Sequence, residues 1–353
     1  MSGFTDLGAT LLRKLDPETA HGLAIKALRT VPLPTPPADD PILTTTIAGL
    51  TLPNPVGLAA GLDKNGEALN GLSKLGFGFV ECGSVTPLAQ AGNPKPRLFR
   101  LSEDRAIINR MGFNNAGLEA FAGHLGDRRP GPVVGANLGA NKDTEDRAAD
   151  YVLGLQRLDG LADYFTVNIS SPNTPGLRAL QGREALDDLL GRVAEARPKV
   201  AGRPRGEGPA PVFLKIAPDL TAAEIGMIVE AAIAHGIDAL IVSNTTLDRP
   251  NLRSPDAGEA GGLSGAPLKD KALHALRDAA AAAGGRLPLI GVGGIASGAD
   301  AYARIRAGAS AVQLYSALIY EGPGLVGRIK RDLAARLRAD GFSSVSEAIS
   351  TSR

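Results

Sequence analysis

Eight short apolar runs recur along most of the chain, and each ends in glycine or in small polar residues. Segments with helical patterning separate them. Because the runs are apolar without alternation, they are typical of parallel strands buried on both faces. Eight such units predict an α/β protein built as a closed (β/α)₈ TIM barrel. The runs are PVGLAAG, GFVECGSV, PVVGANLG, YFTVNIS, PVFLKIA, ALIVSNT, PLIGVGG and AVQLYSAL.

An open, doubly wound sheet is the alternative that the same alternation allows. However, no G-x-G-x-x-G follows the first strand, and no G-x-x-x-x-G-K-[ST] occurs in the chain. These two patterns are the usual nucleotide-binding fingerprints of open sheets. Their absence favours the closed barrel.

Residues 1–36 are predicted to form an amphipathic helical hairpin, distinct from a barrel domain at 37–353. Phe4 and the leucines that follow it share one helical face, and Asp16-Pro17-Glu18 is a strong start for a second helix. VPLPTPP then predicts a stiff extended linker. The hairpin either packs only on the barrel or docks on a membrane surface while it still touches the barrel.

Charge and composition limit the partners and the location. The net charge of the 353 residues is +1, so no basic field is present to hold a nucleic acid. The single cysteine, Cys82, cannot form an intramolecular disulfide, and the four histidines lack metal-ligand spacing. No apolar run reaches the roughly 18 residues of a membrane span, and no secretory signal is recognisable. We therefore expect no metal and a location in the cytosol or on a membrane surface.

Polar residues collect at the carboxyl ends of the apolar runs, where barrels of this kind carry their reactive groups. The densest stretch is NISSPNTPG, at 168–176, which follows the fourth run. Amide side chains match the N–H and C=O edges of a cyclic amide or imide without burial of a charge. Singly, each asparagine has a simpler explanation as a turn former. Their convergence on one rim favours a site for a flat, polar, neutral substrate.

Two lysines and a glycine-rich turn add features of a cofactor site. Lys64 and Lys215 place positive charge where a ligand carries or develops negative charge. The glycines of GVGGIASG leave backbone N–H groups for a phosphate at a helix start. We therefore expect a phosphorylated cofactor across the barrel mouth. A Schiff-base role for Lys215, as in barrel aldolases, is an alternative that does not account for the asparagines.

Ten motifs resemble, in order and over nearly the whole chain, those of dihydroorotate dehydrogenase, class 2. The resemblance implies a quinone-linked enzyme with FMN in a (β/α)₈ barrel, which oxidises dihydroorotate to orotate in pyrimidine biosynthesis. It also implies a peripheral protein on the cytoplasmic face of the cell membrane, without a transmembrane segment. The motifs are AAGLDKNG, GSVTP, GNPKPRLFRL, NRMGFNN, NISSPNTPGLR, KIAPDL, SNTTLDR, GGLSG, GVGGI and VQLYSALIY.

The resemblance also assigns roles to individual residues. Residues implied to contact FMN are Ala60, Gly61, Leu62, Asp63, Lys64, Ser84, Asn137, Asn168, Lys215, Ser243, Gly265, Gly294, Tyr315 and Ser316. Residues implied to contact the substrate are Lys64, Asn109, Arg110, Met111, Gly112, Phe113, Asn168, Asn173, Asn244 and Thr245. Residues implied to line the quinone path are His21, Arg100 and Tyr315.

Ser171 is the implied catalytic base. Because a serine hydroxyl is a weak base, it needs a relay, for which Thr174 with a water is the local candidate. Phe113 would keep water out, and Lys215 would stabilise the reduced flavin. Residues 174–182 are predicted to form a lid over the substrate.

Two other readings remain open. A class 1 enzyme, linked to fumarate or NAD, would use a cysteine base in the loop after the fourth strand. That loop has no cysteine here, because Cys82 lies on the second strand. A non-catalytic, membrane-docked ligand-binding barrel is the second alternative, against which the presence of Ser171, Lys64 and Lys215 argues.

Overall fold

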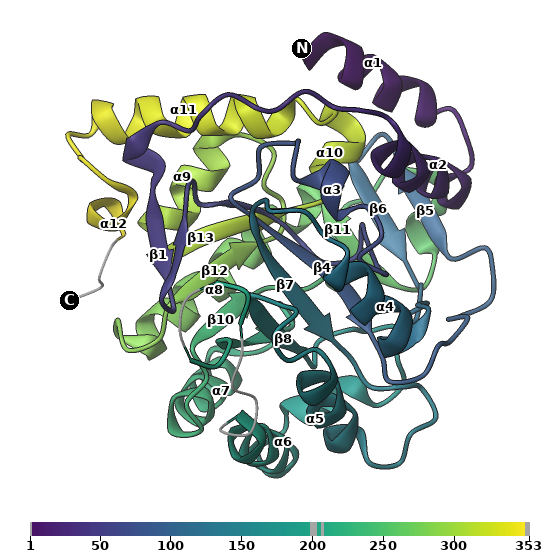
Figure 1. Cartoon of the computed structure of the whole chain (residues 1–353), viewed down its shortest axis with the longest axis vertical. Helices are drawn as coiled ribbons and strands as arrows, with labels where there is room; N and C mark the ends of the chain where they lie inside the picture. The colour runs from purple at the N-terminus through teal and green to yellow at the C-terminus, as the bar shows by residue number, and fades with distance from the viewer. Residues whose placement is uncertain (1, 198–202, 206–207, 350–353) are drawn as a thin grey trace.

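Eight parallel strands close into a barrel in the computed structural model, which describes residues 2–197, 203–205 and 208–349 (Figure 1). Each of the eight apolar runs supplies one barrel strand, so the predicted fold class is confirmed. The strands are β3 (Val56–Leu58), β4 (Phe79–Val85), β7 (Val133–Leu138), β8 (Tyr164–Asn168), β9 (Val212–Ile216), β10 (Ala239–Val242), β12 (Leu289–Val292) and β13 (Ala309–Leu314).

Helices surround the barrel and bury one face against it. Inside the barrel, Tyr164 stacks on Phe213 with ring centroids 4.6 Å apart. A two-stranded hairpin, β1 (Thr45–Ile47) and β2 (Leu50–Leu52), packs its apolar residues against the same interior cluster. The helices are α3 (Leu69–Leu72), α4 (Gly117–Gly126), α5 (Arg147–Arg157), α6 (Arg183–Ala196), α7 (Ala222–Ala234), α8 (Lys269–Ala283), α9 (Gly298–Arg306), α10 (Ser316–Glu321), α11 (Leu325–Ala339) and α12 (Val345–Ala348).

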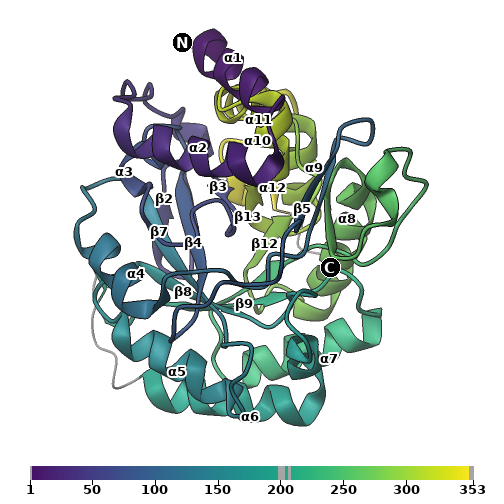
Figure 2. The same cartoon turned by 90° about the vertical axis from the view of Figure 1, so that its right-hand side faces the viewer.

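The N-terminal segment forms α1 (Ser2–Leu12) and α2 (Pro17–Thr30), as predicted. Asp16 caps α2 by accepting a hydrogen bond from the N–H of Thr19 at 2.9 Å. α1 contacts α10, and α2 contacts α3 and the strand at 98–101, so the hairpin lies over one end of the barrel (Figure 2). The side chains of Phe4 and Leu7 lie outside the described residues. A domain boundary at residue 36 stays a prediction.

A three-stranded antiparallel sheet that the sequence did not predict lies beside the barrel. Its order is β11 (Gly262–Gly265), β6 (Ala106–Asn109) and β5 (Leu98–Leu101). The register places Gly262 opposite Asn109 and Gly265 opposite Ala106. Through this pairing, two segments far apart in the sequence reach the barrel mouth together. Short 3₁₀ helices are η1 (Pro41–Leu43), η2 (Leu177–Gln181), η4 (Pro255–Gly258) and η5 (Ala266–Leu268).

Among the described residues, no helix combines the length and the apolar character that crossing a bilayer requires. In the same part of the chain, His, Cys, Asp and Glu side chains form no cluster of three or more that could hold a metal ion.

Candidate active site

A cavity opens at the carboxyl ends of the barrel strands and extends under the antiparallel sheet to α2. Most of the residues that the sequence assigned to ligands line it. These residues are His21, Ala60, Gly61, Lys64, Ser84, Asn109, Met111, Gly112, Phe113, Asn168, Ser171, Asn173, Lys215, Ser243, Asn244, Thr245, Gly265, Gly294, Tyr315 and Ser316. The structure therefore brings together side chains from β3 to β13 and from the N-terminal hairpin.

Other assigned residues do not line the cavity. Asp63 accepts hydrogen bonds from the backbone N–H groups of Glu67 and Ala68, which orders the turn after β3. Arg110 pairs with Glu259 at 2.5 Å. In this structure, both side chains therefore bond to neighbouring segments of the protein. The residues outside the cavity lining are Leu62, Asp63, Arg100, Arg110, Asn137 and Thr174.

Asn168, at the end of β8, is the centre of a buried amide network. Its Nδ2 donates to Ser84 Oγ at 3.0 Å and to Asn137 Oδ1 at 3.1 Å. Its Oδ1 accepts from Ser170 Oγ at 3.0 Å and from Asn244 Nδ2 at 3.4 Å. Asn137 therefore supports Asn168 from inside the barrel, which explains why it is fully buried and absent from the cavity wall.

Glu81 anchors this network and is a residue that sequence reasoning missed. It is fully buried in the barrel and accepts hydrogen bonds from Asn137 Nδ2 at 2.7 Å, Tyr164 OH at 3.1 Å and Gln313 Nε2 at 2.9 Å. A buried carboxylate requires such partners. The available signal was a single acidic residue inside the apolar run GFVECGSV.

Lys64 and Lys215 both reach the cavity, and neither has a hydrogen-bond or ion-pair partner within the described part of the chain. Enclosure by protein lowers the pKa of Lys64 to about 8, although the nearby charge of Glu18 acts in the opposite direction. Burial also lowers the pKa of Lys215, with the charge of Glu81 opposing it. Two enclosed ammonium groups without partners need a ligand that accepts hydrogen bonds or carries negative charge.

Ser171 lies on the loop after β8 and is 6% exposed. Its Oγ accepts a hydrogen bond from the N–H of Asn173 at 3.3 Å, and Asn173 Nδ2 in turn donates to Asn109 Oδ1 at 3.0 Å. The Oγ1 atoms of Thr174 and Thr245 are buried and have no partner in the described structure. These free hydroxyl groups are what a relay and a ligand contact would use.

Phe113 adopts a strained conformation at the cavity wall. Its φ of 54° is in the left-handed region, which is rare for a bulky side chain and is often found at functional sites. Its ring packs so closely on Gly139 that a Cβ there would overlap the ring. This packing holds the ring against the cavity, as its predicted role in excluding water requires.

The glycine turn after β12 has two backbone N–H groups that are free to donate. Gly293 and Gly294 have φ values of 111° and 68°, and the backbone N–H groups of Gly294 and Ile295 have no partner in the described structure. Arg304, a residue that the sequence did not point out, is fully buried and donates to the carbonyl oxygen of Gly293 at 2.8 Å. At the start of α9, Ser297 Oγ accepts from the N–H of Asp300 at 3.1 Å, and Asp300 Oδ2 accepts from the N–H of Ala296 at 3.0 Å. The N–H groups of Gly294 and Ile295 are donors of the turn itself that stay free in the described structure.

The fold and the cavity define a (β/α)₈-barrel protein with a polar ligand site at the carboxyl ends of its strands. The family model of dihydroorotate dehydrogenase matches residues 42–337. The chain belongs to the dihydroorotate dehydrogenase family. The expectation drawn from the motifs is thereby confirmed.

The curated relatives of this chain are named as quinone-linked dihydroorotate dehydrogenases. The dihydroorotate dehydrogenase (quinone) of Rhodospirillum rubrum is 57% identical over 351 residues, which are 99% of this chain and 95% of that one. That of Parvibaculum lavamentivorans is 56% identical over 346 residues, 97% of each chain. The crystal structure of DHODH from Eimeria tenella in complex with ferulenol has a TM-score of 0.91 and 43% identity, over 96% of this chain and 98% of that chain.

Proposed function

We propose that this chain oxidises dihydroorotate to orotate in pyrimidine biosynthesis and passes the electrons to a quinone. The printed names of its relatives support this reaction. The observation that carries the proposal is the convergence of Ser171, Lys64 and Lys215 on one cavity at the barrel mouth. The two lysines have no partners and suit an anionic cyclic substrate beside an anionic cofactor, and the serine hydroxyl can accept a proton from that substrate.

FMN is the cofactor that the residues fit. Lys215 offers an unpaired ammonium group to a flavin ring, and the glycine turn offers free N–H groups to a phosphate. Gly265 and Gly294 have φ values of 100° and 68°, and a Cβ on either would overlap neighbouring backbone. When bound, FMN would supply the redox chemistry, as acceptor for the hydride of C6 of dihydroorotate and as electron donor for the quinone.

Ser171 takes the proton from C5 of dihydroorotate. No histidine or carboxylate hydrogen-bonds its hydroxyl in the described structure, so the proton leaves through a water and the unpaired hydroxyl of Thr174. Phe113 keeps bulk water from this path. Lys64 offers its charge to the substrate carboxylate. Amide groups bind the N–H and C=O edges of the ring, from Asn109, Asn168, Asn173 and Asn244.

The quinone reaches the cavity beside the N-terminal hairpin. The wall there includes Leu98 of β5, a strand that contacts α2, and Ile319 of α10, a helix that contacts α1. Several large apolar side chains on the hairpin and the segment after it are exposed, namely Leu11, Leu15, Leu23 and Val31. Such a surface docks on lipid at the membrane interface. We place the protein on the cytoplasmic face of the cell membrane, as a peripheral protein.

Anaerobic bleaching of the bound flavin by dihydroorotate, followed by recovery of the colour with a quinone, tests this proposal. Recovery with quinone but not with fumarate or NAD supports the class 2 reaction. The reverse preference would instead support a class 1 enzyme, although the loop after β8 lacks a cysteine. A flavin that dihydroorotate does not bleach would leave only a ligand-binding barrel.

A further inference from the structure

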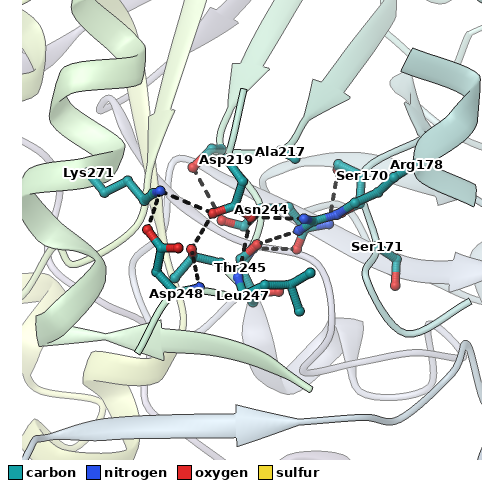
Figure 3. A network of polar contacts seen from close by, with 12 residues as sticks. Ser170, Ser171, Arg178, Ala217, Asp219, Asn244, Thr245, Leu247, Asp248 and Lys271 are labelled. Atoms are coloured by element: carbon teal, nitrogen blue, oxygen red, sulfur yellow. Dashed lines mark hydrogen bonds and ion pairs between the residues drawn. The ribbon is translucent and has the colours of Figure 1, made fainter. Parts of the chain in front are cut away.

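Arg178 donates hydrogen bonds to the backbone of two loops that carry cavity residues. It lies on η2, directly after the loop that carries Ser171. Its Nε donates to the carbonyl oxygen of Ser170 at 3.0 Å, and its Nη2 donates to the carbonyl oxygen of Thr245 at 2.9 Å (Figure 3). One guanidinium group therefore joins the residue before the proposed base to a residue proposed to contact the substrate.

Asp219, on the loop after β9, holds this guanidinium. Its Oδ2 pairs with Arg178 Nη1 at 2.8 Å, and both side chains are 21% exposed. The carboxylate also accepts hydrogen bonds from the hydroxyl of Thr246 and the N–H of Leu247, and Lys271 of α8 lies 3.3 Å from its Oδ1. Three segments of the barrel mouth therefore meet at one ion pair.

The carboxyl group of Asp219 is ionised at neutral pH, because its pKa is lowered. Burial alone would raise the pKa of this carboxyl, but hydrogen bonds from Thr246 and Arg178, together with the Arg178 charge, hold the pKa below its usual value. A second anchor lies nearby, because Gln181 Oε1 accepts the N–H of Ala217 at 2.9 Å. The end of the predicted lid, residues 174–182, is thus fixed to the strand ends in this structure.

Neither Arg178 nor Asp219 lines the cavity, and Ser171 lies beside their network without a bond to it (Figure 3). We infer that Arg178 and Asp219 are positioning residues, which set the distance between the Ser171 loop and the Thr245 loop for proton transfer. This inference rests on the proposed function. Arginine suits the task because its planar group directs several donors in fixed directions, which lysine does not.

The inference predicts a loss confined to one half-reaction. In Arg178→Gln, stopped-flow reduction of the flavin by dihydroorotate should slow by about 100-fold, because a misplacement of about 1 Å has an effect of that size. Reoxidation by quinone should stay within about 2-fold of the wild-type rate, because no Arg178 contact reaches the hairpin side. Arg178→Lys should recover only part of the loss.

The chain offers a matched control at the opposite end of the barrel. Arg197 pairs with Asp238 at 2.7 Å, their side chains are 20% and 29% exposed, and Arg197 also donates to the carbonyl oxygen of Gly236. Arg197→Gln removes the same kind of ion pair without a link to the cavity. It should leave both half-reactions unchanged. An equal slowing in this variant would assign the effect to general loss of structure and overturn the inference.

The same substitution in a variant without the Ser171 hydroxyl distinguishes a positioning role of Arg178 from a purely structural one. In Ser171→Ala, the further change Arg178→Gln should slow flavin reduction by less than about 3-fold, since the hydroxyl that it positions is gone. A full additional loss, or wild-type reduction in Arg178→Gln itself, would overturn the inference. If Arg178→Gln does not fold, Asp219→Asn replaces it, with an expected loss of about 10-fold from the missing charge. A wild-type protein that dihydroorotate cannot bleach refutes the proposed function instead.

Discussion

His21 Nδ1 lies 3.2 Å from the hydroxyl of Tyr315, although the two residues are 294 positions apart. His21 comes from α2, and Tyr315 follows β13 directly, so this contact joins the N-terminal hairpin to the barrel. Burial lowers the pKa of His21 to about 3, and the charge of Lys64 acts in the same direction. Burial raises the pKa of Tyr315 well above its usual value. Both groups are therefore neutral at physiological pH and suit a path for a neutral quinone.

Tyr315→Phe should slow the oxidation of reduced flavin by quinone by about 10-fold, because it removes the hydroxyl that contacts His21 on the proposed quinone path. Flavin reduction by dihydroorotate should not change. Rapid-mixing measurements of the two half-reactions check this. Tyr302→Phe is the control, since that hydroxyl bonds Asp340 on the outside of the barrel. Equal rates of reoxidation in both variants would contradict a role of His21 and Tyr315 in the quinone path.

The double variant Leu11→Glu, Leu15→Glu should lose binding to vesicles of phosphatidylglycerol and phosphatidylethanolamine. These leucines are 58% and 42% exposed on the hairpin, and a carboxylate on an apolar docking face is costly to bury. Turnover with a long-chain quinone in the vesicles should fall, whereas turnover with a short, water-soluble quinone should persist. Leu153→Glu, at a residue of α5 that is 49% exposed, is the matched control. Undiminished vesicle binding of the double variant would contradict the docking proposal.

Ser171→Ala should slow flavin reduction by dihydroorotate by at least about 100-fold, the range expected for loss of a general base. Quinone-driven reoxidation should remain near the wild-type rate, because the proposed role of Ser171 is limited to proton removal from dihydroorotate. Anaerobic stopped-flow absorbance checks both steps. If both slowed equally, the substitution would have damaged the site as a whole and the base would lie elsewhere.

Sequence patterning was sufficient for the barrel, because each strand is a continuous apolar run. It was insufficient for the β5–β6–β11 sheet, whose strands have four residues each and pair Gly262 with Asn109 across a long stretch of chain. A strand that short gives little periodicity, and its partner is fixed only by tertiary structure.

The residues that line the cavity were predicted more fully than the residues that hold them in place. Asn168 and Lys215 lie at the carboxyl ends of β8 and β9, and Ser171 follows β8, so their position in the sequence placed them at the mouth. Arg178 and Arg304 act on backbone carbonyl oxygens of distant segments. No side-chain pattern in the sequence encodes such contacts, and they emerged only from the geometry.

Orotate should bind more weakly above pH 8. The pKa of Lys64 is lowered to about 8, mainly by burial, so this lysine is charged below that pH and loses its charge as the pH rises through it. A carboxylate ligand prefers the charged form. The Kd should therefore be nearly constant from pH 6.5 to 7.5 and increase by up to about tenfold per pH unit above 8. Calorimetric titration checks this, and Lys64→Met should bind weakly with no such dependence. A slope that persisted in Lys64→Met would assign the titration to another group.

Gly294→Ala should both destabilise the protein and release the flavin. At its φ of 68°, an alanine is strained, and the added Cβ would overlap the backbone of Lys269. Conformational strain and overpacking each cost about 1–3 kcal/mol, so the free energy of unfolding should fall by about 2–6 kcal/mol. Urea unfolding and the flavin content per chain check this.

Gly284→Ala is the control that introduces the conformational strain without the overlap. Gly284 ends α8 with a φ of 54°, and nothing lies within 4 Å of the place where its Cβ would be. It should therefore show only the conformational cost, about 1 kcal/mol, with full flavin content. The difference in the free energy of unfolding between the two variants measures the cost of the overlap between a Cβ at position 294 and the backbone of Lys269. Equal flavin content in both would mean that the turn after β12 does not hold the phosphate, because the substitution that displaces its N–H groups would then have no effect on the cofactor.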